Sequence, residues 1–466
     1  MLTYSFEGRG NDSLYEYLYK CITQDIISGN LSPDERLPSK RALAKHLSIS
    51  TVTVENAYSQ LVAEGYIYSK PKSGFYVSRI SSPSPEMQRR TQESTVCVYP
   101  AEEDYSVDLT SNSAAKDSFP FSVWTRLMRE VMSDKGELLT VNSPSVGISD
   151  LRLAISDHLF QFRGMKADPD CIVVGAGTEY LYSLIIQLLG RSRKYAVEDP
   201  GYLKIAQIYS ANNVTLDYVP LDERGIDVAA LRASQADILH ISPSHHYPTG
   251  IVTPVSRRYE LLKWAEQSED RYIIEDDYDS EFRFTGRPIP SLQSIDTSGK
   301  VIYINTFSKT LTSTIRISYM VLPKALMELY KRELSFYSCT VSNFEQYTLA
   351  QFIKQGYYEK HINRMRNYYR SQRDMLMQEI AMHPLFGKVR IKEEDAGLHF
   401  LMKIDTPLSD ESLVKKGREK GIKLACLSSC FSNRESADAH TLIINYSGLS
   451  ADKIKTAVEL LFECIA

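Results

Sequence analysis

Alternating apolar runs and helical stretches from residue 107 onward constrain the fold of this chain more than any other feature. The short apolar runs suit buried strands, and the stretches between them have helical spacing. This alternation predicts an α/β fold with a large, mostly parallel sheet, whose ligands bind beyond the carboxyl ends of the strands. The expected strands are Cys171–Gly175, Tyr195–Glu198, Ile238–Ile241, Tyr272–Glu275, Val301–Ile304 and Ile317–Leu322.

Polar motifs follow several of these strands. The sequence Gly-Ala-Gly177-Thr178 opens a helix, so backbone amides, the Thr178 hydroxyl and the helix dipole suit a phosphate, although such glycines more often mark only a tight turn. Tyr202 follows the second strand, where its ring suits stacking on a planar ligand. The loop after the third strand carries His245 and His246, for which we favour a structural or ligand-edge role over acid–base chemistry.

A cluster of carboxylates ends the fourth expected strand, in the sequence Ile273-Ile-Glu-Asp276-Asp277-Tyr278-Asp279. Like charges packed this closely are destabilising unless a cation faces them. A protonated pyridine nitrogen would be such a cation, and Asp276 would then hold the ring as an electron sink. Helix capping or a metal-binding acid cluster is the alternative explanation.

Lys309 lies in a hydroxyl-rich turn between the last two expected strands. A lysine between buried strands is costly unless its charge is paired or removed. An imine with an aldehyde cofactor would give this lysine a chemical role, whereas the alternative is a packed stem with its amine in solvent. Arg316, beyond the turn, suits bidentate binding of a phosphate, and Thr306 and Ser308 add hydroxyl donors.

The first eighty residues have the pattern of three helices followed by a hairpin. Ser13 and Glu16 have capping-box spacing before an apolar helical face. Ser39 suits the cap of a second, short helix, and a turn over 48–50 leads into the third. Two aromatic-rich runs over 66–77 suit a small β-hairpin. This order predicts a helix-turn-helix with a wing.

Basic side chains concentrate on this module, although the whole chain has a formal net charge of -4. They suit contacts to DNA phosphates, and the third helix would enter the major groove with its N-terminal hydroxyl residues. A charged face that only meets solvent is the alternative. The predicted DNA-binding residues are Arg36, Ser39, Lys40, Arg41, Ser50, Thr51, Thr53, Lys70 and Lys72.

The length of 466 residues predicts more than one domain. We expect a DNA-binding domain over 1–79, a flexible linker rich in serine and proline over 80–106, and an α/β domain over 107–466 with a smaller C-terminal subdomain from about 325. The sequence lacks a long apolar run and a signal-peptide core, so we expect a cytoplasmic protein without membrane contact. We expect no metal site, including at Cys426 and Cys430.

Two parts of the chain resemble known families. The N-terminal module resembles the winged helix-turn-helix of GntR-type bacterial regulators, although that family often has an arginine at the position of Thr51. The remainder resembles the fold-type I aminotransferases, and together the parts are similar to the MocR/GabR subfamily of GntR regulators over nearly the full length. The stretches that carry these resemblances are Leu37–Arg41, Leu43–Leu47, Leu61–Tyr66, Gly175–Thr178, Pro200–Tyr202, Pro243–Gly250, Tyr272–Phe282, Thr306–Lys309 and Gly397–Phe400.

The resemblance implies pyridoxal 5'-phosphate as the cofactor, with Lys309 as its internal aldimine and Asp276 as the partner of the ring nitrogen. It implies that Tyr278 bonds the phenolic oxygen and that Tyr202 stacks on the ring. It further implies a head-to-tail homodimer that binds promoter DNA and a small-molecule effector. The phosphate ligands that it implies are Gly177, Thr178, Thr306, Ser308 and Arg316.

One position departs from the pattern of the family. Gly448 stands where the γ-aminobutyrate-sensing relatives place an arginine for the ligand carboxylate. Lys204 is a weaker, single-point substitute, and His246 is a second candidate for ligand contact. We therefore expect an effector that is not a standard amino acid held by a carboxylate clamp, such as pyridoxal phosphate itself or an amino-containing peptide or amine.

Three functions are compatible with this sequence. The leading interpretation is a transcriptional regulator in which ligand exchange at Lys309 changes how two winged helices face their DNA half-sites. The competing interpretation is an active aminotransferase with an accessory N-terminal domain, which would turn over an amino donor without promoter affinity. A binding module that has lost the cofactor is disfavoured by the intact set of Lys309, Asp276 and Arg316.

Overall fold

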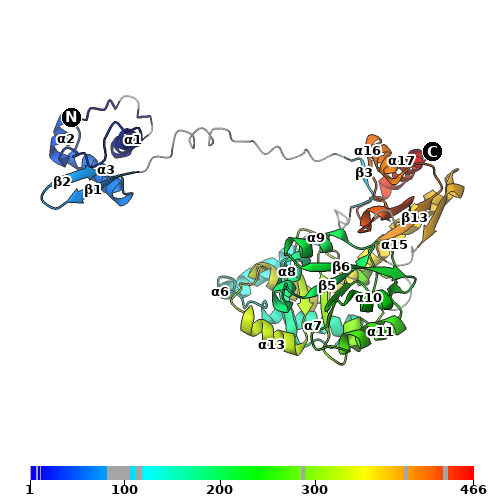
Figure 1. Ribbon diagram of the computed structural model, residues 1–466. Coiled ribbons are helices and arrows are strands. Elements are labelled where there is room, and N and C mark those ends of the chain that lie inside the picture. Colours follow the sequence, from blue (N-terminus) through cyan, green and yellow to red (C-terminus); the bar gives the residue numbers. More distant parts are fainter. Residues whose placement is uncertain are drawn as a thin grey trace. The chain divides into compact units, whose positions relative to one another are not determined.

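The chain divides into two compact units, Met1–Glu102 and Glu103–Ala466 (Figure 1). The computed structural model describes residues 2–6, 9–10, 12–80, 105–111, 118–284, 289–392, 397–433 and 439–465. The predicted linker over 80–106 falls almost entirely outside these residues. Within the described part of the chain, no helix is both long and apolar enough to cross a membrane.

The N-terminal unit consists of three helices and a hairpin around a core of its own. Ser13 and Glu16 form a capping box, and Ser39 and Ser50 cap the second and third helices through their side-chain oxygens. Tyr58 is fully buried in the core. The elements are α1 (Leu14–Ile27), α2 (Lys40–Leu47), α3 (Thr51–Ala63), β1 (Ile67–Lys70) and β2 (Gly74–Val77). The predicted winged helix-turn-helix is confirmed.

An eight-stranded sheet forms the centre of the C-terminal unit. Its strand order is β4-β11-β10-β9-β8-β5-β6-β7. The strands from β10 to β6 in this order are parallel, whereas β11 is antiparallel to both of its neighbours and β7 is antiparallel to β6. The strands are β4 (Ile172–Gly175), β5 (Lys194–Asp199), β6 (Thr215–Asp222), β7 (Gly225–Ile226), β8 (Ile238–Ile241), β9 (Tyr272–Asp276), β10 (Val301–Thr306) and β11 (Ser318–Val321). The predicted α/β fold is confirmed.

Helices cover both faces of this sheet. Successive side chains of a strand point to opposite faces, so Ile172 and Val174 pack with α7 and α14, whereas Val173 between them packs with α8 and α13. The helices are α7 (Ser149–Arg163), α8 (Thr178–Leu189), α9 (Leu203–Ala211), α10 (Val228–Ser234), α11 (Val255–Glu266), α13 (Lys324–Glu333) and α14 (Asn343–Lys354). Because the faces are covered, a ligand reaches the sheet at the ends of its strands.

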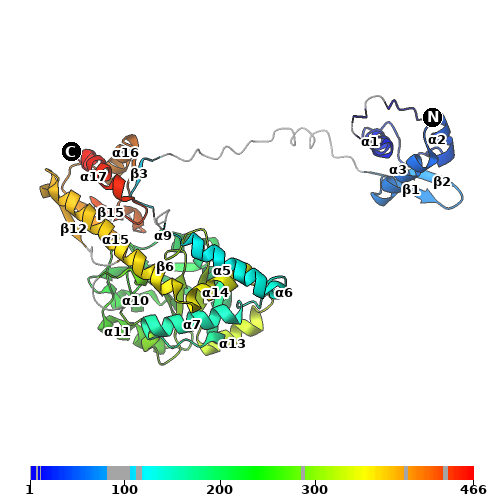
Figure 2. The ribbon, with the colours of Figure 1, turned by 180° about the vertical axis from the view of Figure 1, so that it is seen from behind.

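The long helix α15 (Tyr357–Met382) leads to a smaller C-terminal subdomain (Figure 2). We expected this subdomain from about 325, but α13 and α14 pack on the large sheet, and Met365 is the first residue of α15 in the C-terminal core. This subdomain contains an antiparallel sheet, two helices and a short pair of parallel strands. In that pair β3 lies beside β14, one of the C-terminal elements (Figure 1). These elements are β3 (Val107–Asp108), β12 (Val389–Lys392), β13 (His399–Ile404), α16 (Asp410–Glu419), β14 (Ile422–Lys423), β15 (Thr441–Asn445) and α17 (Ile454–Ile465).

Candidate functional site

A cavity of about 190 Å³ lies where the parallel strands of the large sheet end. β9 ends at Asp276, β10 ends at Thr306, and the loops after β5 and β8 contribute Tyr202 and Ser242. Of the residues that we expected at a site, those that line this cavity are Thr178, Tyr202, Lys204, Asp276, Tyr278, Thr306, Ser308, Lys309 and Arg316. The lining residues that we did not expect are Glu179, Tyr182, Ile205, Ser242, Tyr247 and Ser313.

Lys309 lies in the turn after β10 and lines the cavity. Phe307 anchors this turn, because its ring is buried and its amide donates to the carbonyl of Ile317 at 2.9 Å. Burial lowers the pKa of Lys309 to about 8, although the carboxylates of Asp279 and Asp276 oppose the shift. More of this amine is therefore neutral near pH 7 than in an exposed lysine, and the neutral amine is the nucleophilic form.

Asp276 lines the cavity and is held through only one of its carboxylate oxygens. The Tyr182 hydroxyl donates to Oδ2, and Nε2 of His240 lies 3.6 Å from the same oxygen. Oδ1 is buried and has no hydrogen-bond partner in the described part of the chain. A buried carboxylate oxygen without a donor is costly, so this atom suits a cationic N–H group of a ligand.

The other carboxylates of this motif have partners of their own. Asp277 accepts a hydrogen bond from the buried guanidinium of Arg163. Oδ2 of Asp279 lies 2.9 Å from Nδ1 of His245. The crowding of like charges expected from the sequence is therefore relieved by separate partners, and Asp276 is the carboxylate of the motif that lines the cavity.

Arg316, Thr306 and Ser308 form a polar end of the cavity, and Gly177, which does not line the cavity, lies directly behind Arg316. Gly177 is the N-cap of α8 with a φ of 91°, and a Cβ added there would lie 2.3 Å from Nη2 of Arg316. Any larger residue would thus displace the guanidinium. The Ser308 amide donates to Thr306 Oγ1 at 3.1 Å, and Ser308 Oγ is buried without a partner among the described residues. A helix N-terminus, a guanidinium and an unpaired hydroxyl together suit an anion.

Glu179 is the residue that sequence reasoning missed at this end of the cavity. It accepts a hydrogen bond from Nζ of Lys204, and its Oε1 lies 3.8 Å from Nη2 of Arg316. The hydrogen bond from Lys204 lowers the pKa of Glu179, so the carboxylate is charged near neutral pH. Lys204 therefore lines the cavity with its amine already paired with the Glu179 carboxylate. The available signal was the position of Glu179 directly after Thr178, in the first turn of α8.

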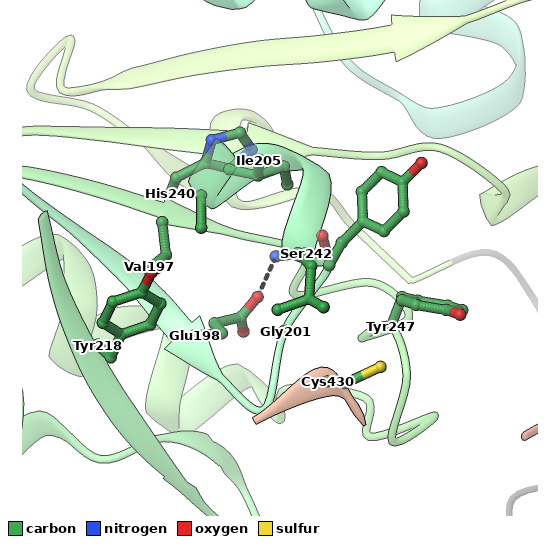
Figure 3. Close-up of a pocket in the computed structure, with 12 residues that line it drawn as sticks. Val197, Glu198, Gly201, Ile205, Tyr218, His240, Ser242, Tyr247 and Cys430 are labelled. Atoms are coloured by element: carbon green, nitrogen blue, oxygen red, sulfur yellow. Dashed lines mark hydrogen bonds between the residues drawn. The ribbon is translucent and has the colours of Figure 1, made fainter. Parts of the chain in front are cut away.

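Tyr202 and Tyr247 line both this cavity and a smaller one of about 30 Å³. Figure 3 shows the smaller cavity, with Tyr247 among its labelled residues. The ring centroids of Tyr202 and Tyr247 are 5.6 Å apart, with the ring planes at 83°. In the smaller cavity the Ser242 amide donates to Glu198 Oε2 at 2.9 Å. Burial raises the pKa of Glu198 to about 8. The two tyrosines give the larger cavity an aromatic side, and because their rings are nearly perpendicular, only one of them can stack face to face on a planar ligand.

His246 and Tyr278, two residues that we expected at the site, contact other side chains of the protein. His246 is buried, with Nε2 3.5 Å from Glu198 Oε2 and Nδ1 2.7 Å from Thr249 Oγ1, and it is not among the lining residues of either cavity. Burial lowers the pKa of His246 to about 3, so its imidazole is neutral. The Tyr278 hydroxyl lies 3.2 Å from Nδ1 of His245.

Gly448 is not among the residues that line the cavity. It follows β15, and a Cβ added to it would lie 3.3 Å from the Ser111 hydroxyl. The neighbouring Ser447 hydroxyl is 2.8 Å from Asn445 Oδ1. The backbone at 448 therefore lies against Ser111, outside the lining of the cavity.

The expected DNA-binding residues lie on or just before α2 and α3 and in the wing of the N-terminal unit, and Arg36, which precedes α2, forms a β-bridge with Tyr76 of β2. Ser39 and Ser50 serve as helix caps, and the Thr53 amide donates to Ser50 Oγ at 3.0 Å. Thr51 is exposed in the first turn of α3, beside Val52, which is 63% exposed and was not predicted. An exposed valine on a helix of this kind suits contact with a thymine methyl group.

The basic residues of this surface differ in how far their charge is already paired. Lys40 forms an ion pair of 2.6 Å with Glu55, and the amine of Lys70 lies 4.5 Å from the ring centroid of Tyr76. The remaining basic residues are exposed, and they are Arg36, Arg41 and Lys72. These exposed cations are the best placed for phosphate contacts.

Two family descriptions match the chain. Residues 14–77 match "Bacterial regulatory proteins, gntR family", and residues 104–461 match "Aminotransferase class I and II". The chain is 36% identical to an uncharacterized HTH-type transcriptional regulator, YdeL, of Bacillus subtilis (strain 168), over 96% of each chain. It is 29% identical to the probable rhizopine catabolism regulatory protein MocR of Rhizobium meliloti, over 96% of this chain and 93% of MocR.

A pyridoxine biosynthesis regulator and a solved aminotransferase are also similar. The HTH-type regulator PdxR of Corynebacterium glutamicum is 29% identical over 89% of this chain and 88% of its own. The multiple substrate aminotransferase of Thermococcus profundus superposes with a TM-score of 0.68 and 22% identity, over 83% of this chain and 95% of its own. At that identity the solved structure shows the fold alone.

Proposed function

This chain belongs to the MocR/GabR subfamily of GntR-type transcriptional regulators, and we propose that it senses a small ligand through pyridoxal 5'-phosphate bound at Lys309. One observation carries the proposal. The amine of Lys309 and the unpaired Oδ1 of Asp276 belong to the same cavity, whose lining also includes a polar end that suits an anion and the rings of Tyr202 and Tyr247. These groups match an aldehyde, a pyridine nitrogen, a phosphate and a planar ring.

The residues of the cavity fit this cofactor group by group. Asp276 would hold the ring nitrogen as a cation, because its Oδ1 lacks any other donor among the described residues. Ser308 Oγ, the N-terminus of α8 and Arg316 would hold the phosphate, and Gly177 keeps room for the guanidinium. The cofactor supplies an aldehyde that reacts reversibly with amines, so that a ligand amine can replace Lys309.

We propose pyridoxal phosphate itself or an amino compound as the effector. The carboxylate clamp of an amino-acid sensor needs a cation that no other group engages. Lys204 already pairs with Glu179, and Arg316 is the cation that we assign to the phosphate. This charge pattern supports an effector without a dedicated carboxylate contact. PdxR, a relative over most of the chain, is named as a regulator of pyridoxine biosynthesis, which favours the cofactor as a candidate.

We further propose that residues 1–79 bind promoter DNA, that 80–106 tether them, and that 107–466 form a head-to-tail homodimer. Exposed apolar side chains on α5 (Phe121–Asp134) and around α6 (Gly136–Leu139) support an interface in the C-terminal unit. The exposed residues there are Phe121, Met132, Leu138 and Val141. In a dimer, two winged helices meet two half-sites, and a change in packing between subunits would alter their spacing.

A working aminotransferase is the second candidate, because the solved structures that superpose on the C-terminal unit include aminotransferases. The relatives aligned over nearly the whole chain are named transcriptional regulators, which favours regulation. Assay of the purified chain with amino donors and keto acids separates the two, because an enzyme turns over many equivalents and a sensor at most about one.

Reduction by borohydride tests the role of Lys309. Incubation with pyridoxal phosphate, reduction and peptide mapping should place one cofactor mass on the peptide that contains Lys309. Lys309→Ala should abolish this attachment, whereas Lys204→Ala, which removes another amine from the same cavity, should retain it. Attachment spread over surface lysines, or unchanged in Lys309→Ala, would overturn the proposal.

A further inference from the structure

A second cavity, of about 370 Å³, lies between α7 and α15 and shares no lining residue with the cofactor cavity. Its floor is the chain around the short 3-10 helix η2 (Ser280–Phe282), which follows the carboxylate motif of β9. The residues that line it are His158, Gln161, Phe162, Ser280, Arg283, Phe284, Glu359, Ile362, Asn363, Arg366 and Arg370. The proposed cofactor chemistry does not use the three arginines of this lining.

Arg366 and Arg370 lie one turn apart on the same side of α15. In the described part of the chain neither guanidinium forms an ion pair with a carboxylate. Burial lowers the pKa of Arg366, and the charge of Arg370 lowers it further against the attraction of Glu281. Two adjacent cations without a carboxylate between them create a positive potential that an anion would relieve.

The hydrogen bonds of the two arginines leave donors for a ligand. Arg366 donates from Nε to the Glu281 carbonyl at 3.1 Å and from Nη1 to Asn363 Oδ1 at 3.2 Å. Arg370 donates from Nη2 to the Phe284 carbonyl at 2.5 Å. Nη2 of Arg366 and Nη1 of Arg370 have no hydrogen-bond acceptor among the described residues.

One acid, Glu359, also lines this cavity. Its Oε1 lies 3.3 Å from Nδ1 of His158, whereas its Oε2 is buried without a hydrogen-bond partner among the described residues. Burial raises the pKa of Glu359, but the contact with His158 outweighs burial and the pKa is lowered. Apolar walls are supplied by Phe162, Ile362 and Phe284. The α15 side of the cavity therefore carries two cations and one acid, and the other sides mix apolar with polar residues. The volume of the cavity exceeds that of a bare inorganic ion several-fold.

We propose that this cavity binds a small organic oxyanion, a carboxylate or a phosphate ester, through Arg366 and Arg370. Guanidinium groups bind both kinds of oxyanion with charge-assisted hydrogen bonds, and the aromatic walls accommodate the carbon skeleton. The same arginines hold the carbonyls of Glu281 and Phe284, which lie a few residues after Asp276. An anion bound by these arginines is connected through them to the segment that follows the Asp276 carboxylate. The chain thus has a second ligand-binding site, separate from the cofactor cavity.

Calorimetric titration of the full chain tests this site without any cofactor. Inorganic phosphate and succinate are the two probes, each at an ionic strength held constant with chloride, and saturable binding of one or both is expected. Arg370→Gln should weaken binding at least about tenfold through the loss of a charge-assisted contact. Lys360→Gln removes the same formal charge from α15 outside the cavity and should bind like the wild type.

Asn363→Asp tests the effect of charge in the cavity while it keeps an acceptor for Arg366. Its carboxylate can still accept the hydrogen bond from Arg366, but it places a competing negative charge in the cavity, so binding should again weaken about tenfold or more. Inorganic phosphate also suits the polar end of the cofactor cavity, so Arg316→Gln should lose that part of the phosphate binding and keep the part that depends on Arg370. Absence of saturable binding for both probes, or binding that Arg370→Gln leaves at wild-type strength, would overturn the proposal.

Discussion

Lys309 has the strongest chemical signature of any single residue in the cavity. Burial lowers the pKa of its amine to about 8. Because only the neutral amine attacks an aldehyde, we expect the rate of pyridoxal phosphate attachment to rise with pH up to about 8 and to level off above it. Stopped-flow absorbance across the alkaline range measures this profile. A rate that keeps rising toward the ordinary lysine pKa of about 10.4 would contradict the environment described for Lys309.

Asp276 is the residue on which we expect cofactor affinity to depend most. Asp276→Asn keeps an oxygen to accept from Tyr182 but removes the charge that faces the ring nitrogen. A hydrogen bond to a charged group contributes about 1.5–3 kcal/mol, so the Kd for pyridoxal phosphate should rise roughly 10- to 100-fold. Equilibrium dialysis gives the Kd, and the melting temperature without cofactor shows whether the fold is intact. An unchanged Kd in a folded variant would exclude this role.

Individual residues differ in how far the sequence predicts their surroundings. Asp276, Thr306 and Lys309 lie at or just after the ends of strands that the sequence predicts. All three line one cavity. Glu179 and Tyr182 were missed, because their contacts depend on how α8 is rotated about its axis, which a short polar motif does not specify. Gly448 was interpreted from its place in a motif, but β15 ends at Asn445 and the glycine beyond it packs against Ser111.

Among the elements, the winged helix-turn-helix has the most direct test. Lys72 lies at the tip of the wing with an exposed side chain. If it contacts a DNA phosphate, Lys72→Ala should lower the slope of log affinity against log salt by about one. Lys20→Ala is the matched control, because Lys20 lies on α1 and pairs with Asp12 at 2.6 Å. Equal slopes in both variants and the wild type would show that Lys72 of the wing does not contact a DNA phosphate.

Element types could be predicted better than element neighbours. The buried strands were visible as apolar runs, and the hairpin wing followed from its aromatic runs and turn residues. The order of strands was not predictable, because β11 joins β4 to β10 across more than a hundred residues. The attachment of α13 and α14 to the large sheet was also missed, because an apolar helical face does not specify which surface it covers.

At the scale of the whole molecule, each unit has a hydrophobic core of its own. Deletion of residues 1–79 should therefore leave cofactor attachment at Lys309 intact and abolish promoter binding. Borohydride trapping and gel-shift assays on the truncated chain measure the two properties separately. Loss of both properties would indicate that the units depend on each other for folding, against the separation of their cores.

The central claim is that DNA binding by this regulator depends on whether the cofactor is attached at Lys309. DNase footprinting of the region upstream of the protein's own gene, with and without pyridoxal phosphate, tests it most directly. We expect a protected site whose extent or affinity changes with the cofactor, and a Lys309→Ala variant that protects the same site but no longer responds. No protection under any condition, or an equal response in Lys309→Ala, would contradict the account.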